Sequence, residues 1–167
     1  GALLKAAKML GSEDILFILL GDGDAKNEIL DTIKKYDLKN VMMSPPVAGA
    51  EKVAMYINYS DVCVMPLKPE MLTSTLTRPS KVFEFWACGK PVVACTKGEM
   101  EYLANESGAG IIVEPGDVQG LSEAIKDLYQ NPDKTSEMGK RAREYVVRRF
   151  SYESLRTSLI ATLDKVK

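Results

Sequence analysis

Five short apolar runs alternate with longer segments of helical periodicity along the chain. The first run, at residues 15–20, is unbroken and of strand length, which is typical of a strand buried on both faces of a parallel sheet. The predicted strands are 15–20, 40–43, 62–65, 91–94 and 110–113. Strands that alternate with helices at this spacing predict right-handed βαβ units, and therefore an α/β, Rossmann-like fold with a doubly wound parallel sheet.

The segments between and after these strands have the spacing of amphipathic helices. The predicted helices are 2–10, 25–36, 51–59, 79–88, 100–105, 118–130, 134–148 and 152–166. Asp117 and Ser151 are suitable N-caps for two of the three C-terminal helices. The chain has no internal repeat or low-complexity tract, so we expect residues 1–167 to form a single domain around one core.

The helix between Pro79 and Gly89 is the most informative segment. Proline suits the first helical position because it has no amide hydrogen to leave unpaired, and glycine suits the residue just past the end. Free amides and the helix dipole attract anions to such a helix start. Glu84, slightly deeper in the same helix, can accept hydrogen bonds from sugar hydroxyls. This combination indicates a nucleotide-sugar site.

Ligands of open parallel sheets bind beyond the carboxyl ends of the strands. The loops that follow the predicted strands are 21–24, 44–47, 66–80, 95–100 and 114–117. The helix that contains Glu84 begins at this same edge. We therefore expect the functional site here.

Charge and composition exclude several other functions. Lys and Arg number 22 against 23 Asp and Glu, so nothing favours a nucleic-acid partner or attraction to an anionic membrane. The chain has no histidine, which excludes Ser-His-Asp and Cys-His catalysis within it. Cys63, Cys88 and Cys95 lack metal-ligand spacing and are expected to be reduced core thiols of a cytoplasmic protein. No run is long enough to cross a bilayer, and the first residues lack the pattern of a signal peptide.

Several weak motifs occur together in one order over nearly the whole chain. They are Leu20-Gly21-Asp22-Gly23, Asn40-Val41, Ser60-Asp61-Val62, Pro79-x-Lys81-x-x-Glu84-x-x-Ala87-x-Gly89-Lys90-Pro91, Gly98-x-x-Glu101, Gly108-x-Gly110, Pro115-Gly116-Asp117 and Phe150-Ser151-Tyr152. In this order they resemble the C-terminal, donor-binding half of retaining GT-B glycosyltransferases (group 1, family 4). The resemblance implies transfer of a sugar from a UDP- or GDP-sugar to a glycan or lipid-linked acceptor.

The resemblance also implies a role for each part of the site. The backbone at two glycines would approach the nucleotide diphosphate, and a Pro-Val loop would lie against the base. The helix start would lie beneath the diphosphate, and the helix carboxylate would bind the ribose hydroxyls. The implied donor-binding residues are Gly21, Gly23, Pro46, Val47, Pro79, Ser80, Lys81 and Glu84. The family needs no metal or other cofactor, and no catalytic residue is assigned in this chain.

The sequence departs from the family pattern at three places. Leu76 occupies the position of an earlier glutamate that contacts the donor sugar, and Glu70 is the nearest carboxylate upstream. Pro45 replaces a usual glycine. The family's first strand and its acceptor-binding N-terminal half should precede Gly1, so we expect a fragment of a longer two-domain enzyme, inactive alone. The helix from Tyr152 would cross back to that half, and peripheral membrane association stays open.

Other functions and structural roles are open to some of these residues. Leu76 favours a non-catalytic glycosyltransferase-like regulatory or binding module. A dinucleotide fingerprint would need a third glycine at the position of Lys26. Asp22 and Asp24 follow the wrong element for a signalling receiver domain, and an epimerase on the same scaffold would need histidines. Structural roles are expected for Trp86, in the core, and for the basic residues 140–143, on a solvated helix face.

Overall fold

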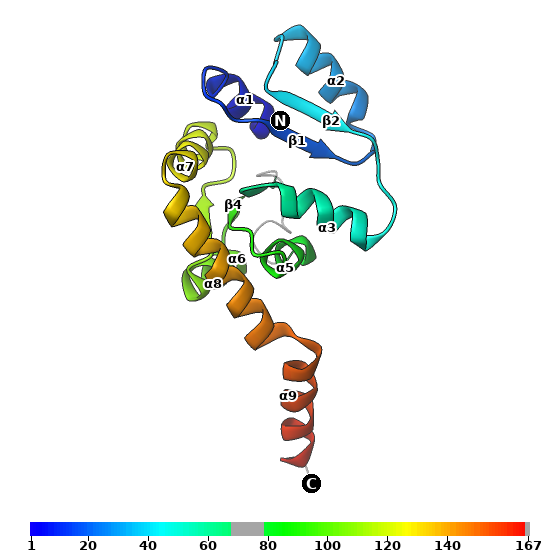
Figure 1. Ribbon diagram of the computed structural model, residues 1–167, viewed down its shortest axis with the longest axis vertical. Helices are drawn as coiled ribbons and strands as arrows, with labels where there is room; N and C mark the ends of the chain where they lie inside the picture. Colours follow the sequence, from blue (N-terminus) through cyan, green and yellow to red (C-terminus); the bar gives the residue numbers. More distant parts are fainter. Residues whose placement is uncertain (68–78, 166–167) are drawn as a thin grey trace.

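The computed structural model describes residues 1–67 and 79–165. The strands are β1 (Phe17–Leu20), β2 (Val41–Ser44), β3 (Cys63–Pro66), β4 (Val92–Cys95) and β5 (Gly110–Val113). The helices are α1 (Ala2–Met9), α2 (Lys26–Lys35), α3 (Ala50–Tyr59), α5 (Ser80–Ala87), α6 (Glu99–Ser107), α7 (Val118–Gln130), α8 (Pro132–Phe150) and α9 (Tyr152–Asp164). Strands and helices alternate as far as β5 (Figure 1). The predicted α/β fold is confirmed.

All strand pairs are parallel, as predicted, but hydrogen bonding divides the described strands into two groups. β1 pairs with β2, and Phe17 lies opposite Val41. β4 is the central strand of the second group, with β3 on one side and β5 on the other. The described strands therefore form a two-stranded sheet, β1-β2, and a three-stranded sheet, β3-β4-β5.

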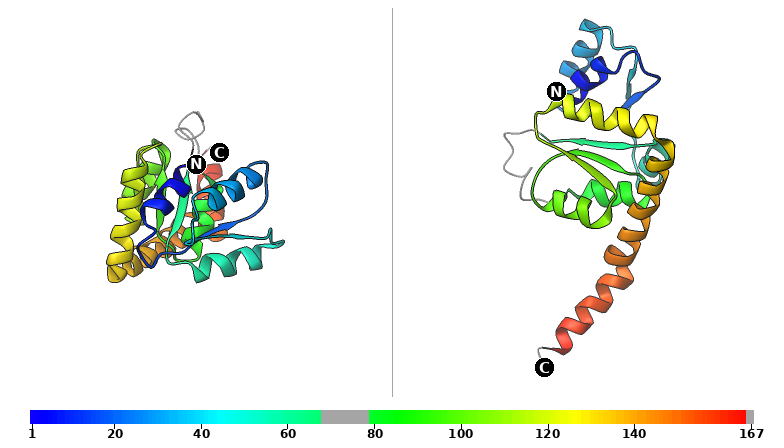
Figure 2. Two further views of the ribbon diagram at one scale, coloured as in Figure 1. Left: turned by 90° about the horizontal axis from the view of Figure 1, so that it is seen from above. Right: turned by 90° about the vertical axis from the view of Figure 1, so that its left-hand side faces the viewer.

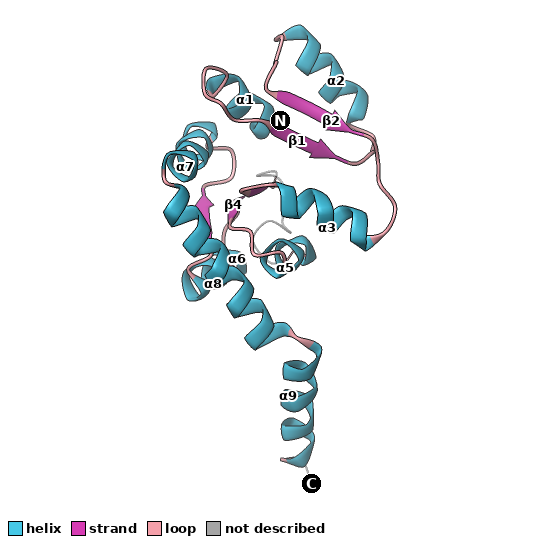
Figure 3. Ribbon diagram, viewed as in Figure 1, coloured by secondary structure: helices cyan, strands magenta, loops and turns pink. Residues whose placement is uncertain are grey.

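Helices cover both faces of the group formed by β3, β4 and β5 (Figures 2 and 3). On β4, Val93 and Cys95 belong to a core shared with α1 and α7. The alternate residues Val92 and Ala94 belong to a second core, shared with α5, α6 and α8. All four residues of β4 are buried, as expected for a strand covered on both faces. The doubly wound arrangement is thus present around this strand.

Trp86 lies in the second core, as predicted, and its side chain is fully buried. Its indole Nε1 donates a hydrogen bond to the Ala109 carbonyl over 3.3 Å, so the polar atom of the ring is satisfied. The rings of Trp86 and Tyr145 meet edge to face, with 5.7 Å between their centroids. This contact joins α5 to α8.

Element boundaries differ from the predictions in small ways that the structure explains. Pro79 is the N-cap of α5 and not its first residue, because its ψ of 123° is extended. The first strand starts at Phe17 and not at residue 15, because its partner strand starts opposite it. α6 and α8 are each longer than predicted. Asp117 and Ser151 are confirmed as N-caps, accepting from the amides of Gly120 and Ser154 respectively.

The basic residues of α8 do more than face solvent. Arg141 Nε donates to the Gly108 carbonyl over 3.1 Å, at the end of α6. Arg143 donates to the Ala87 carbonyl, at the end of α5. Arginines in such positions satisfy the last carbonyls of a helix. Both side chains are exposed, as predicted for a solvated helix face, and each also joins α8 to a neighbouring helix.

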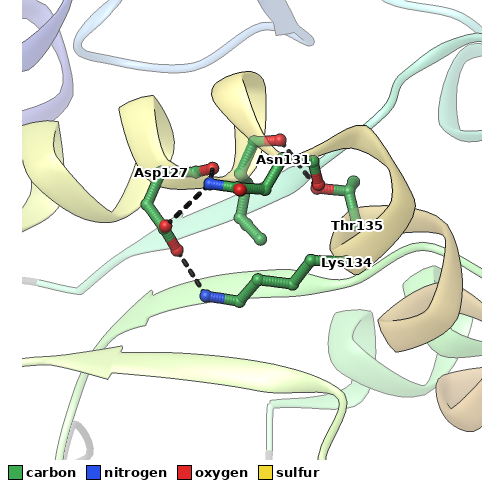
Figure 4. Close-up of polar contacts among 5 residues, drawn as sticks. Asp127, Asn131, Lys134 and Thr135 are labelled. Carbon is green, nitrogen blue, oxygen red and sulfur yellow. Dashed lines mark hydrogen bonds and ion pairs between the residues drawn. The ribbon is translucent and has the colours of Figure 1, made fainter.

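Polar side chains fix the turn between α7 and α8 (Figure 4). Asn131 Nδ2 donates to the Asp127 carbonyl over 2.8 Å, and Lys134 forms an ion pair with the Asp127 carboxylate. The Thr135 hydroxyl, buried in α8, donates to the Leu128 carbonyl over 2.7 Å. These contacts satisfy the C-terminal carbonyls of α7 and set the direction of α8. α8 leads to α9, which projects away from the body in Figures 1 and 2.

A close approach between backbones holds α8 against the end of α5. A Cβ added at Gly139 would lie 2.2 Å from the carbonyl oxygen of Gly89. Gly89 itself has a φ of 68°, a conformation that suits glycine. The two glycines therefore allow a contact that any side chain at position 139 would prevent.

We expect Gly139→Ala to lower the free energy of unfolding by about 1–3 kcal/mol, because the new methyl group forces α8 away from α5. In an ordinary helix position the same change is favourable by roughly 1 kcal/mol. Ser136→Ala, at an exposed position of α8, is the matched control and should raise stability by a few tenths of a kcal/mol, on the order of the propensity difference. Urea unfolding of both variants measures this. An unchanged or raised stability for Gly139→Ala would show that the close contact does not constrain the fold.

Two of the three cysteines are buried in the cores, as predicted, and Cys88 is half-buried. Burial raises the pKa of the Cys63 thiol to about 12, and it also raises the pKa of the Cys95 thiol. A thiol with a raised pKa stays protonated, and only the thiolate is a good nucleophile.

We therefore expect iodoacetamide to alkylate Cys88 first in the folded chain at pH 8, with Cys63 and Cys95 modified only on unfolding. Mass spectrometry of tryptic peptides, with and without urea, measures the order. The raised pKa also means that the folded state holds the Cys63 proton more tightly than the unfolded state does. Its contribution to the free energy of unfolding is complete below the ordinary pKa of about 9 and is lost as the pH rises towards 12. Modification of Cys63 at the same rate as Cys88 would contradict the burial of the Cys63 thiol.

Candidate functional site

A cavity of about 1780 Å³ opens at the carboxyl ends of β1 and β3 and the start of α5. Its lining includes all but one of the donor-binding residues that the sequence predicts: Gly21, Pro46, Val47, Pro79, Ser80, Lys81 and Glu84. Gly23 is exposed and lies outside the lining. Segments far apart in the sequence therefore meet at the edge where parallel sheets bind ligands.

The turn after β1 begins at Gly21, which has a φ of 132°. Other residues rarely adopt this conformation, and no atom lies within 4 Å of the place where a Cβ would be. The Asp22 carboxylate accepts the Gly23 amide over 3.0 Å and pairs with Lys26 over 3.3 Å. These two contacts, the amide first, hold the pKa of Asp22 below its usual range. Asp22 thus stabilises the turn while the Gly21 backbone stays accessible from the cavity.

The loop after β2 is held by a pair of hydroxyls. Ser44, the buried last residue of β2, shares a hydrogen bond of 2.7 Å with the Tyr56 hydroxyl of α3. Pro46 and Val47 follow directly and line the cavity. Sequence reasoning missed this pair, because residues 12 apart on a strand and a helix give no local signal.

The start of α5 has the features of an anion site. Pro79 caps the helix without a side-chain hydrogen bond, and the first turn contains no acidic residue. The first amides, at Ser80 and Lys81, precede the intrahelical bonding of the helix and remain available. The exposed Lys81 side chain adds a full positive charge to the partial charge of the helix dipole. Behind these residues Val82 is fully buried, which fixes the helix start.

Glu84 lies four residues after Ser80, so the two residues share one face of α5. Its carboxylate is exposed and forms no ion pair or hydrogen bond with the described residues, Lys81 included. The Glu84 carboxylate is therefore not an ion-pair partner of Lys81. An unpaired carboxylate can accept two hydroxyl hydrogens, such as those of a vicinal diol.

Leu76 and Glu70, which bear on the missing family glutamate, lie outside the described residues. Within 1–67 and 79–165, no group of three histidine, cysteine, aspartate or glutamate residues is placed to hold a metal ion. In the same part of the chain, no helix has the length and apolar character that crossing a membrane requires.

The family model described as "Glycosyl transferases group 1" matches residues 2–131. The chain belongs to this family. It is 25% identical over 149 residues to N-acetyl-alpha-D-glucosaminyl L-malate synthase of Bacillus anthracis, a match that covers 89% of this chain and 37% of that protein. It is 26% identical over 146 residues to D-inositol 3-phosphate glycosyltransferase of an Arthrobacter species, which covers 84% of this chain and 33% of that protein. The chain thus spans about a third of the length of these relatives.

Solved structures share the fold. The Anabaena protein HepE in complex with UDP superposes with a TM-score of 0.83 at 21% identity, covering 98% of this chain and 44% of that one. The C-terminal domain of the group 1 family protein LpcC from Francisella tularensis gives a TM-score of 0.75 at 16% identity, covering 90% of this chain and 78% of that one. These matches confirm the Rossmann-like fold predicted from the sequence.

Proposed function

We propose that this chain is the donor-binding part of a retaining glycosyltransferase that uses a UDP- or GDP-sugar. The observation that carries the proposal is the meeting of Gly21, Lys81 and Glu84 on one cavity. An accessible backbone, a cationic helix start and a free carboxylate are complementary to the three polar parts of a nucleoside diphosphate. Family membership supports the same reaction class.

In this proposal the diphosphate binds between the Gly21 turn and the start of α5. Glycine lets the backbone approach the phosphates closely, and the amides of Ser80 and Lys81 donate to phosphate oxygens. Glu84 accepts the ribose hydroxyls, while Pro46 and Val47 lie against the base. HepE was crystallised with UDP and with UDP-glucose, which favours uridine as the first base to test.

The catalytic contribution of this part is to stabilise the leaving group. When the bond between the sugar and the diphosphate breaks, the diphosphate departs with the electron pair and gains negative charge. The helix dipole of α5 and the Lys81 ammonium group are fixed where that charge develops, so they stabilise it without rearrangement. The acceptor and the rest of the machinery belong, in this proposal, to an additional domain of the whole protein.

An exposed apolar stripe supports the idea of an additional domain. α9 exposes large apolar side chains at helical spacing: Tyr152, Leu155, Leu159, Ile160 and Leu163. An amphipathic helix normally buries such a stripe. We propose that α9 packs against the acceptor-binding half.

A non-catalytic binding module remains the second candidate because Leu76 replaces the sugar-binding glutamate. Full-length protein that binds a sugar nucleotide without transferring the sugar would favour this second candidate.

Glu84→Gln should reduce nucleotide binding roughly tenfold, because the amide is a weaker acceptor for ribose hydroxyls than the carboxylate. Saturation-transfer NMR of the chain with UDP, GDP, ADP and NAD measures this and identifies the base. Glu153→Gln, an exposed change on α9 far along the chain, is the matched control and should leave every signal unchanged. Equal signals from both variants would exclude Glu84 from the site. If the full-length protein binds none of these four nucleotides, the proposed function is overturned.

The Lys81→Gln variant should distinguish binding of the diphosphate from binding of the nucleoside. We expect UDP or GDP to bind roughly five- to tenfold more weakly, because a charge-assisted contact is lost, whereas uridine or guanosine binds unchanged. Lys134→Gln, in the first turn of α8, is the control. Competition NMR at two salt concentrations gives the affinities. Equal weakening of nucleoside and nucleotide would place Lys81 away from the phosphates.

A further inference from the structure

One face of α3 is turned towards the cavity of the candidate site. Val53, Tyr56 and Ile57 lie three and four residues apart, so they share this face, and all three line the cavity. Ile57 is only 5% exposed, and Val53 packs against the same core. Tyr56 is the polar member of this otherwise apolar set. Because its side chain is half-buried, its hydroxyl needs hydrogen-bond partners within the protein or on a ligand.

The protein partner of the Tyr56 hydroxyl is Ser44, at the end of β2. Ser44 is 4% exposed, and 2.7 Å separate its Oγ from Tyr56 Oη. Ser44 Oγ also donates to the Pro45 carbonyl over 3.3 Å, and a serine hydroxyl has only one hydrogen. With that hydrogen on the carbonyl, Tyr56 is the donor within the hydroxyl pair. Tyr56 Oη then keeps a lone pair that can accept a hydrogen bond from a ligand.

The loop backbone beside this oxygen offers few polar groups. Pro45 and Pro46 have no amide hydrogen, and the Pro45 carbonyl already accepts from Ser44. Pro46 and Val47 line the same cavity as Tyr56, and their side chains present apolar atoms to the face of a planar base. Polar recognition of the edge of that base therefore needs a side chain, and Tyr56 supplies one.

We propose that Tyr56 Oη accepts the ring N–H of a keto base, which is N3–H in uracil and N1–H in guanine. Cytosine N3 and adenine N1 carry a lone pair in place of this hydrogen, so two acceptors would face each other. Tyr56 is then a residue that determines specificity for the base. The inference rests on the proposed function, because it assigns a residue to the base part of the proposed donor site.

The Ser44 hydroxyl makes this discrimination possible. A tyrosine hydroxyl alone can donate to a ring nitrogen as easily as it accepts from one. Here, turning the hydroxyl pair round takes the Ser44 hydrogen away from the Pro45 carbonyl. The carbonyl then loses its bond, and a polar group left without a partner is costly. Ser44 is therefore a positioning residue, which keeps Tyr56 in the role of acceptor.

Nucleotides that differ at the ring nitrogen test the proposal. Isothermal titration calorimetry of the full-length protein compares UDP with CDP and with N3-methyl-UDP, both of which lack the N3 hydrogen. We expect each of the two to bind roughly tenfold more weakly than UDP, which is the loss expected for one hydrogen bond with a half-buried partner. Where GDP is the tighter ligand, GDP and N1-methyl-GDP replace UDP and N3-methyl-UDP, and ADP replaces CDP.

Tyr56→Phe removes the oxygen and keeps the ring. We expect this variant to bind UDP about as weakly as CDP, while its affinity for CDP equals that of the unaltered protein. A tyrosine that only holds the loop would give a different result, because UDP and CDP would then weaken by the same factor. Tyr102→Phe, an exposed change on α6, is the matched control and should keep the full preference for UDP.

Three results would overturn the proposal. These are equal weakening of UDP and CDP by Tyr56→Phe, an unchanged preference for UDP in that variant, and equal binding of UDP and N3-methyl-UDP by the unaltered protein. The last comparison does not depend on the folding of any variant. Failure of the proposed function is distinguishable, because no nucleoside diphosphate then binds at all. Binding without this preference leaves the donor site in place and excludes Tyr56 from contact with the base.

Discussion

The burial of β4 on both faces is the constraint on which the rest of the structure depends. Val93 and Cys95 pack against α1 and α7, while Val92 and Ala94 pack against α5, α6 and α8. The same strand also hydrogen-bonds to β3 and β5. Because both cores and both neighbouring strands meet on these four residues, a side chain that no longer fits there disturbs every layer at once. α5 packs against this strand, so the strand sets the position of the helix start in the candidate site.

Much of this arrangement could be predicted because it is encoded locally. Unbroken apolar runs identified the strands, and Asp117 and Ser151 identified two helix starts by chemistry that acts over three residues. Contacts between distant segments had no such signal. The capping of α5 and α6 by Arg143 and Arg141 joins residues tens of positions apart. The division of the strands into two groups was equally invisible, because apolar periodicity shows that a strand is buried but not which strand lies beside it.

The candidate site shows the same limit. The sequence identified Ser80 and Glu84 as one helix face, since residues four apart share a face in any helix. It also predicted that this face and the Gly21 turn lie at one edge of the sheet, but not which contacts between distant elements hold them there. The Ser44–Tyr56 hydroxyl pair, which holds the loop of Pro46, was missed for this reason. Conversely, Gly23 fits the motif but lies outside the cavity lining.

The two halves of the candidate site differ in how firmly the structure holds them. The start of α5 is fixed by the buried Val82 and Trp86 and by the Gly89–Gly139 contact. The Gly21 turn follows β1, which pairs only with β2 among the described strands and exposes Ile18 and Leu20. A ligand that bridges both halves gains full affinity only when the distance between them is fixed beforehand, since otherwise binding must supply the ordering free energy. Packing that fixes the distance between the two halves therefore acts on affinity through geometry, without touching the ligand.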